Sequence, residues 1–184
     1  MTRCCLVVTT HERPDALGRV LDAVTTQSRP PDELIVADDG SGPATAEVVT
    51  QHAARAGYPV LHEWQPHAGF RAGRIRNAAI ARSHCEYIVL LDGDMVVHPE
   101  FLADHLALAR PGHFSQGVRI LLDAQATRRM LDGTAGLPGP LSPGLGIVRR
   151  AYGLRSPALA RSVRRLANAV VAVKACNQGF WRDD

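Results

Sequence analysis

Two carboxylates separated by a single glycine carry the clearest chemistry in this 184-residue chain. Asp92 and Asp94 flank Gly93 and follow an apolar run at residues 87–91. Such a run is typical of a buried parallel strand, and open α/β sheets bind ligands at the carboxyl ends of these strands. Acids one residue apart on an extended chain point the same way, and a shared divalent cation would offset their repulsion. An acidic loop without a ligand is the alternative interpretation.

Other polar groups follow apolar runs that we also expect to be strands. Thr9 and His11 follow the first run, Asp39 follows the second, and Arg71 and Arg76 lie near the start of a helix after the third. A carboxylate can accept the imide hydrogen of a pyrimidine, and guanidinium groups at a helix start favour phosphate. Because parallel strands end at one edge of a sheet, these loops should meet there and bind a nucleoside diphosphate. Ordinary turn chemistry and a solvated helix face are the alternatives.

Hydrophobic periodicity places these groups on alternating strands and helices. Strands are predicted at residues 3–9, 33–37, 59–64 and 86–91, and helices at residues 14–27, 43–56, 72–83 and 99–109. Strands separated by helices of about a dozen residues are typical of right-handed βαβ units. We therefore expect a three-layer, Rossmann-like α/β fold with a mixed, mainly parallel sheet. Residues 114–122 and 168–175 are predicted to add later strands.

Length and composition indicate one ordinary globular domain over residues 1–184. Hydrophobic residues make up 46% of the chain and charged residues 21%, which is close to average usage. Apolar runs stay well below the length of about eighteen residues that a spanning helix needs, and no signal peptide is visible. We therefore expect a cytoplasmic protein. The cysteines at positions 4, 5, 85 and 176 have neither metal-binding spacing nor a disulfide pattern.

Charge is distributed unevenly along the chain. Residues 1–127 contain 11 Lys and Arg against 15 Asp and Glu, whereas residues 128–184 contain 10 against 3. A flexible segment rich in glycine and proline is expected at residues 133–156, followed by a basic amphipathic stretch at residues 157–167. The arginines of residues 149–165 could contact anionic lipid at the inner face of the membrane, or form a solvated face. Nucleic acid is a poor fit, because aromatic residues make up 5% of the chain.

Five motifs, in their order along the chain, resemble those of family 2 inverting glycosyltransferases of the GT-A fold. They are Thr9-Thr10-His11-Glu12-Arg13-Pro14, Ala37-Asp38-Asp39-Gly40-Ser41, Gly69-Phe70-Arg71 with Arg74-Ile75-Arg76-Asn77, Leu91-Asp92-Gly93-Asp94 and Gln116-Gly117-Val118-Arg119. Residues 175–182 also resemble the stretch that lines the acceptor side in that family. The resemblance is nearest to short bacterial enzymes that build lipopolysaccharide, capsule and related surface glycans.

The resemblance implies a role for each matched residue. The residues implied for the nucleotide are Thr9, His11, Asp39, Arg71, Arg76, Asn77 and Asp92. Asp94 would be the ligand of Mg²⁺ or Mn²⁺, and Gly93 would let substrate approach the backbone. The residues implied near the donor sugar and the acceptor are Cys176, Asn177 and Trp181. The implied reaction is metal-dependent, inverting transfer of a hexose from a nucleotide diphosphate sugar, most readily a UDP-sugar, to a hydroxyl of a glycan or lipid-linked acceptor.

The resemblance also implies a division of the chain and a missing group. Residues 1–123 would bind the nucleotide sugar, and residues 157–184 would begin the acceptor-side part. In this family the general base lies some tens of residues beyond the segment matched here, and therefore beyond Asp184. Losing a general base typically costs about 10²–10⁴-fold in rate. We expect this chain to bind nucleotide and metal but to transfer sugar poorly.

Two other functions fit parts of the sequence. A haloacid-dehalogenase-type phosphatase also has an apolar strand that runs into two acids, and Lys174, Asp183 and Asp184 could imitate its later motifs. Three strand–helix units precede Asp92, however, whereas the nucleophile of that class should come early. The other alternative is a truncated, non-catalytic protein that binds sugar nucleotides.

Overall fold

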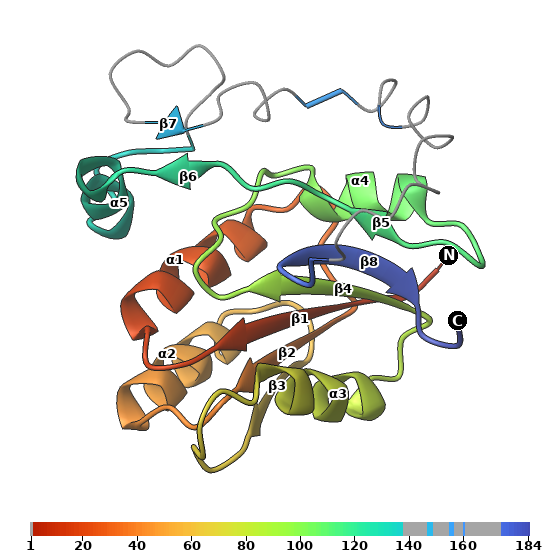
Figure 1. The fold of residues 1–184 in the computed structure, drawn as a ribbon, viewed down its shortest axis with the longest axis horizontal. Helices are drawn as coiled ribbons and strands as arrows, with labels where there is room; N and C mark the ends of the chain where they lie inside the picture. The colour runs from red at the N-terminus through yellow and green to blue at the C-terminus, as the bar shows by residue number, and fades with distance from the viewer. Residues whose placement is uncertain (1, 138–146, 149–154, 157–159, 161–173) are drawn as a thin grey trace.

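The computed structural model describes residues 2–137, 147–148, 155–156, 160 and 174–184. Its elements in chain order are β1 (Cys4–Thr10), α1 (Pro14–Thr25), β2 (Glu33–Asp38), α2 (Pro43–Ala53), β3 (Val60–Trp64), α3 (Ala72–Arg82), β4 (Tyr87–Asp92), α4 (Phe101–Leu108), β5 (Ser115–Gln116), β6 (Leu121–Leu122), α5 (Ala124–Leu131), β7 (Ile147–Val148) and β8 (Asn177–Trp181) (Figure 1). The alternation of strands and helices predicted for the first hundred residues is confirmed, with bounds that differ by a few residues.

Six strands form one sheet in the order β3-β2-β1-β4-β8-β5. β1 pairs in parallel with β2 and with β4, and β2 pairs in parallel with β3. β8 lies between β4 and β5 and runs antiparallel to both, as the reversed arrow of β8 beside β4 shows (Figure 1). The predicted mixed, mainly parallel sheet is therefore confirmed. The remaining pair, β6 and β7, forms a small sheet of its own.

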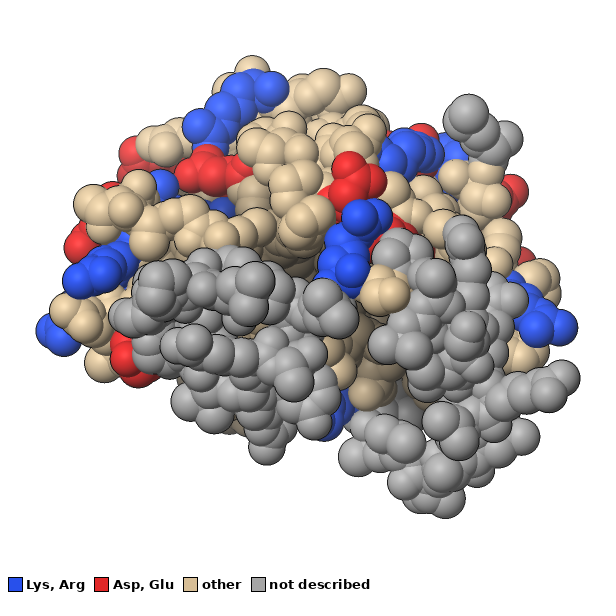
Figure 2. All heavy atoms as spheres, turned by 90° about the horizontal axis from the view of Figure 1, so that it is seen from above, with Lys and Arg blue, Asp and Glu red and all other residues tan. Residues whose placement is uncertain are grey.

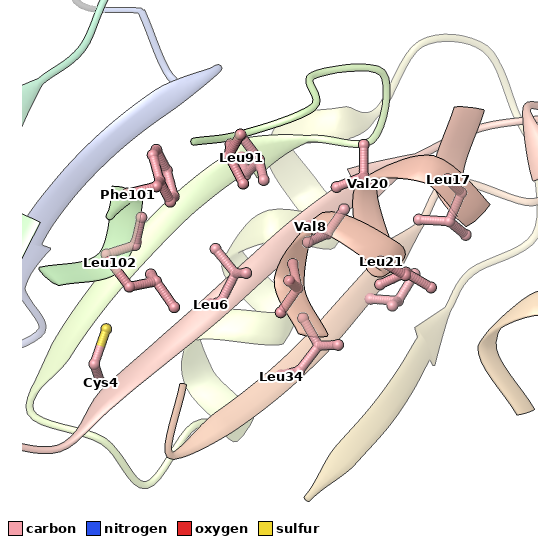
Figure 3. Close-up of a cluster of buried hydrophobic side chains, with 14 of the residues drawn as sticks. Cys4, Leu6, Val8, Leu17, Val20, Leu21, Leu34, Leu91, Phe101 and Leu102 are labelled. Carbon is pink, nitrogen blue, oxygen red and sulfur yellow. The ribbon is translucent and has the colours of Figure 1, made fainter. Parts of the chain in front are cut away.

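Helices cover both faces of the six-stranded sheet, because side chains alternate along each strand. Leu6 and Val8 of β1 pack with Leu17 of α1 in one buried cluster (Figure 3). Val7, between them, packs instead with Ile75 of α3 in a second buried cluster. These two clusters make the three layers that the sequence predicted. They also leave the carboxyl ends of β1, β2 and β4 at one edge of the sheet.

The strand predicted at residues 114–122 is confirmed only near its two ends. This stretch contains two strands of two residues each, β5 and β6, which belong to different sheets. The break falls at Gly117, where a Cβ atom would lie 2.1 Å from Nδ2 of Asn177. The helix α5 that follows was not predicted, although Asp123 caps it by accepting a hydrogen bond of 2.8 Å from the N–H of Ala126.

The last strand begins later than predicted. β8 starts at Asn177, and residues 174–176 are not part of a strand, while residues 168–173 of the predicted strand lie outside the described residues. Most of the segments expected to be flexible at 133–156 and basic at 157–167 lie outside them too. Among the residues that the structure describes, none of the helices is long and apolar enough to cross a membrane.

Candidate functional site

The register of the parallel strands brings the predicted polar groups together at one edge. Thr9 of β1 lies opposite Asp92 of β4, and Thr10 lies opposite Asp38 of β2. Asp39 follows Asp38 directly, and its N–H donates a hydrogen bond of 3.0 Å to the carbonyl of Thr10. Groups separated by about thirty and eighty residues in the sequence therefore meet at the ends of three neighbouring strands. We call this edge, with the loops that follow β1, β2, β3 and β4, the strand-end site.

Arg76 joins the β1 and β4 sides of the strand-end site. From α3, its Nε donates to Oγ1 of Thr9 at 2.8 Å, and its Nη2 donates to Oδ1 of Asp92 at 2.7 Å. Burial raises the pKa of Asp92 above its ordinary value, with a smaller contribution from Asp94, while Arg76 opposes the shift. The guanidinium therefore holds Asp92 in a fixed orientation at a position where burial disfavours its charge.

Asp94 is held quite differently from Asp92. Its side chain is exposed, and it has no hydrogen-bond or ion-pair partner among the described residues. The chain turns at Gly93, whose N–H donates 2.7 Å to the carbonyl of Thr9. A Cβ at Gly93 would lie 2.8 Å from that same carbonyl oxygen. Packing against β1 therefore requires glycine at position 93. The sequence suggested a different reason, namely that glycine lets a substrate approach the backbone.

The residues present fit one kind of divalent cation site. The described part of the chain has no group of three or more His, Cys, Asp or Glu side chains that could hold a metal ion. Mg²⁺ and similar cations, however, are commonly bound by one or two carboxylates, with substrate phosphates and water supplying the other ligands. The unpaired carboxylate of Asp94, with Asp92 two residues away, matches this kind of donor set.

Asp39 is enclosed by the loop that joins β3 to α3. Its Oδ1 accepts 2.6 Å from the amide of Gln65, and its Oδ2 accepts 2.8 Å from the backbone N–H of Arg71. Burial tends to raise the pKa of Asp39, but these two hydrogen bonds and the nearby charge of Arg71 outweigh it and lower the pKa. With 3% of its surface exposed, Asp39 is an ionised and oriented acceptor.

Two histidines stack beside Asp39. The rings of His11 and His67 are parallel within 18°, with centroids 4.5 Å apart. Each donates from Nδ1 to the carbonyl of Asp39, at 3.0 Å and 3.3 Å respectively. Gly40 makes the arrangement possible, because its φ is +89° and a Cβ there would lie 2.4 Å from the backbone nitrogen of His67. The exposed imidazoles thus form an aromatic surface next to a buried carboxylate.

Two other residues predicted to bind the nucleotide, Arg71 just before α3 and Asn77 within α3, make fewer contacts in the site. Arg71 donates from Nη2 to the carbonyl of Pro66, and its Nε is buried without a hydrogen-bond partner. Asn77 is exposed and has no side-chain partner among the described residues. The structure therefore brings Arg76 and the backbone of Arg71 into the strand-end site, while Asn77 stands outside its hydrogen-bond network.

The three residues predicted for the acceptor side separate from one another. The carbonyl of Cys176 accepts 3.2 Å from the N–H of Asp92, so this residue lies in the strand-end site. Asn177 is buried, and its Oδ1 accepts 2.9 Å from Nε2 of His105. Trp181 pairs with Tyr87 at the opposite end of β4 and packs on it edge to face, with ring centroids 5.5 Å apart. Trp181 therefore lies away from the strand-end site, because β8 runs antiparallel to β4.

Several residues of the site were missed by sequence reasoning. Gln65 and His67 hold Asp39 from the third loop, and His105 holds Asn177 from α4. Burial lowers the pKa of His105. Its Nε2 donates to Oδ1 of Asn177, and its Nδ1 shares a hydrogen bond of 2.8 Å with Oγ of Ser115. The sequence around these residues does not indicate their roles, because each role depends on a hydrogen-bond partner far away in the sequence.

Charges on the surface are mixed. Figure 2 shows acidic and basic side chains lying next to one another on the face seen from above. A hollow of about 340 Å³ lies elsewhere, between α1, α2 and Leu131 of α5, and none of the strand-end residues lines it. Of its charged residues, Arg19 and Arg55 both pair with Asp22, and Asp15 pairs with Arg13. We therefore locate the functional site by the converging strand ends and not by this hollow.

Comparison with known proteins points to the family that the sequence motifs resemble. The profile of glycosyl transferase family 2 matches residues 5–133. Galactofuranosyltransferase GlfT1 of Mycobacterium tuberculosis is 31% identical over 156 residues, which are 83% of this chain and 48% of that protein. The hyaluronan synthase of Pasteurella multocida is 30% identical over 103 residues, 55% of this chain and 10% of that protein. The chain spans about half of the first relative's length and much less of the second's.

Solved structures share the fold. The mannosyltransferase PcManGT of Pyrobaculum calidifontis, in complex with GDP-Man and Mn²⁺, matches with a TM-score of 0.58 and 22% identity, over 64% of this chain and 36% of that chain. TarS of S. aureus, residues 1–349 in complex with UDP-GlcNAc, matches with a TM-score of 0.51 and 23% identity, over 57% and 30% of the two chains. The predicted GT-A fold is confirmed.

The family match excludes the phosphatase alternative. Its supposed nucleophile, Asp92, is paired with Arg76, and Asp183 and Asp184 follow β8 at the end of β4 opposite to Asp92. The strand-end motifs, the fold and the profile match over most of the chain agree: this chain belongs to glycosyl transferase family 2.

Proposed function

We propose that this chain binds a nucleotide diphosphate sugar in the strand-end site and belongs to an enzyme that transfers the hexose, with inversion, to an acceptor hydroxyl. The acceptor would be a glycan or lipid-linked sugar used in cell-surface polysaccharide synthesis, reached from the cytoplasmic side of the membrane. The observation that supports this proposal most directly is that Arg76 bonds to Thr9 and Asp92 beside the exposed carboxylate of Asp94. Anion-binding and cation-binding groups adjoin there, as a metal–diphosphate requires.

The β2 end of the site would recognise the nucleotide base. The carboxylate of Asp39 is ionised, and its two oxygens retain lone pairs beyond those used by Gln65 and Arg71. It could accept the imide hydrogen of uracil or thymine, and the exposed ring of His11 or His67 would stack on the base. UDP is the preferred nucleotide on this reasoning.

The β4 end would bind the diphosphate and a divalent cation. Asp94, helped by Asp92, would hold Mg²⁺ or Mn²⁺, and the bound ion would neutralise charge on the leaving diphosphate. Arg76 keeps Asp92 oriented, and the guanidinium of Arg71 adds positive charge beside the base-binding loop. That a related fold was solved with GDP-Man and Mn²⁺ supports this choice of cation.

The β8 side of the site would face the sugar and the acceptor. Cys176 lies against Asp92, and Asn177 is oriented by His105. The acceptor hydroxyl would attack the anomeric carbon in line with the departing diphosphate, which inverts the configuration. Relatives named as a galactofuranosyltransferase and a hyaluronan synthase support a glycan acceptor.

Calorimetric titration with UDP, dTDP and GDP, each with and without Mn²⁺, tests this proposal. We expect UDP to bind more tightly than GDP, and Mn²⁺ to strengthen its binding by at least about tenfold, because the carboxylate pair alone repels the diphosphate. Binding that is indifferent to Mn²⁺, or no binding by any of the three nucleotides, would contradict it.

A further inference from the structure

Glu12 has an unusual backbone conformation at the β1–α1 loop. Its φ is 48°, and it is the one non-glycine residue with a positive φ in the described part of the chain. Residues other than Gly, Asn and Asp seldom adopt this left-handed region. Such strain persists only where surrounding contacts hold it, and it is concentrated at functional sites. The contacts of Glu12 should therefore show what holds this backbone conformation in place.

Glu12 is fastened twice to the loop after β2. Its backbone N–H donates 2.8 Å to Oγ of Ser41, and its Oε1 accepts 2.8 Å from the N–H of Gly42. Gly42 precedes the first residue of α2, so the carboxylate also lies at the positive end of the helix dipole. One residue thus uses both its backbone and its side chain to join two loops.

The loop that receives Glu12 is itself firmly held. The N–H of Ser41 donates 2.8 Å to Oδ1 of Asp38, and the carbonyl of Ser41 accepts 3.1 Å from Nε1 of Trp64. Asp38 is fully buried. Ser41 therefore offers a fixed point, against which Glu12 can set the position of the more exposed β1–α1 loop.

The two groups flanking this connection are those assigned to the nucleotide base. His11 precedes Glu12 and donates to the carbonyl of Asp39, while Asp39 precedes the Gly40–Ser41 turn. Both hydrogen bonds of Glu12 end on the β2–α2 loop, and neither is made to the side chain of His11 or Asp39. These two bonds therefore act on the base end by setting the position of the loop that carries His11.

We infer that Glu12 is a positioning residue, which sets His11 against Asp39 so that the base end of the site is formed before the nucleotide binds. This inference rests on the proposed function. The carboxylate matters as a hydrogen-bond acceptor more than as a charge, so Glu12→Gln should keep the role and Glu12→Ala should lose it. Glu47→Ala is the matched control, because it removes an exposed glutamate of α2 whose one hydrogen bond within the described part of the chain is from Gln51.

The test is calorimetric titration of UDP in the presence of Mn²⁺ for the whole chain. We expect Glu12→Ala to weaken UDP binding about tenfold, which corresponds to about 1.4 kcal/mol, and Glu12→Gln and Glu47→Ala to remain within about twofold of wild type. In a His11→Ala background the further change Glu12→Ala should cost less than about twofold, since no imidazole remains to be positioned. Thermal unfolding shows which variants are folded at the assay temperature.

Each other outcome is informative. If wild type binds no nucleotide, the proposed function fails and this inference fails with it. If wild type binds UDP but Glu12→Ala binds equally well, the inference alone is overturned. Fully additive losses in the His11→Ala background, or an equal loss in Glu47→Ala, would also overturn it, because they indicate a general effect on the fold or on charge.

Discussion

The β2 end and the β4 end of the strand-end site hold their carboxylates in opposite ways. Asp39 at the β2 end is 3% exposed, and both of its oxygens accept hydrogen bonds from the protein. Asp94 at the β4 end is exposed and has no direct partner among the described residues. A group that recognises the shape of a base must be oriented beforehand, whereas a group that binds a hydrated cation must keep its lone pairs free.

Substituting the unpaired acid should have the largest effect on binding. We expect Asp94→Asn to lower the affinity for UDP in the presence of Mn²⁺ by about tenfold or more, which is the gain expected from the cation. The free energy of unfolding should not change, because the carboxylate makes no hydrogen bond or ion pair with the described residues. Titration with UDP and Mn²⁺ measures the first quantity, and urea denaturation measures the second. Asp132→Asn, which alters an exposed acid at the end of α5, should change neither. If UDP binding by Asp94→Asn still depended on Mn²⁺, the assignment of Asp94 as the cation ligand at the β4 end would be contradicted.

Removing the partner of the half-buried acid should chiefly affect stability. We expect Arg76→Met to lower the free energy of unfolding by about 2 kcal/mol at neutral pH, because Asp92 would be left without its charge partner. The loss of Arg76 should raise the pKa of Asp92 further, so the penalty should shrink as the pH falls and Asp92 becomes protonated.

Arg82→Met is the matched control, since Arg82 lies on the same helix and pairs at the surface with Glu63. Urea denaturation between pH 5 and 8 compares the two variants. A similar, pH-independent loss in both would mean that the helix, and not the pairing with Asp92, is what Arg76 supports.

The β2 end should also respond to acid, with a smaller effect on stability. The pKa of Asp39 is lowered in the folded state, so its contribution to stability is complete above the ordinary Asp pKa and is lost as the pH falls through the lowered value. Asp39→Asn should therefore make the free energy of unfolding less dependent on pH below about 4, by up to about 1.4 kcal/mol per pH unit. Urea denaturation of wild type and Asp39→Asn across this range checks the prediction, and equal slopes in the two proteins would contradict the assignment.

The smallest effect is expected at a paired cation outside the site. Arg155 donates from Nε and Nη2 to the two oxygens of Asp104, at 2.7 Å and 2.8 Å. If the basic segment at 149–165 meets anionic lipid, Arg155→Ala should not alter liposome co-sedimentation at low salt, because Asp104 already neutralises this guanidinium. Joint replacement of Arg161, Arg164 and Arg165 by Ala should reduce retention. Unchanged retention in that triple variant would remove membrane contact from the proposal.

The helices and strands of the first hundred residues could be read from the sequence because their signals are local. The continuous apolar run at residues 4–8 indicates a buried strand, and Pro14 and Pro43 mark the first turns of α1 and α2. Asp39 directly follows β2, and Asp92 is the last residue of β4. Parallel pairing then implies that the acids share an edge. For the same reason most of the candidate site could be predicted from the order of its motifs along the chain.

The residues that end the strands can therefore be identified from sequence patterns, whereas the pairing of those residues depends on the folded chain. The bonds of Arg76 to Asp92 and of Gln65 to Asp39 join parts of the chain that share no sequence pattern. The antiparallel insertion of β8 placed Trp181 at the opposite end of the sheet, although it lies four residues from Asn177. Periodicity identifies a strand but not its neighbour or direction, because those depend on the packing of the whole sheet.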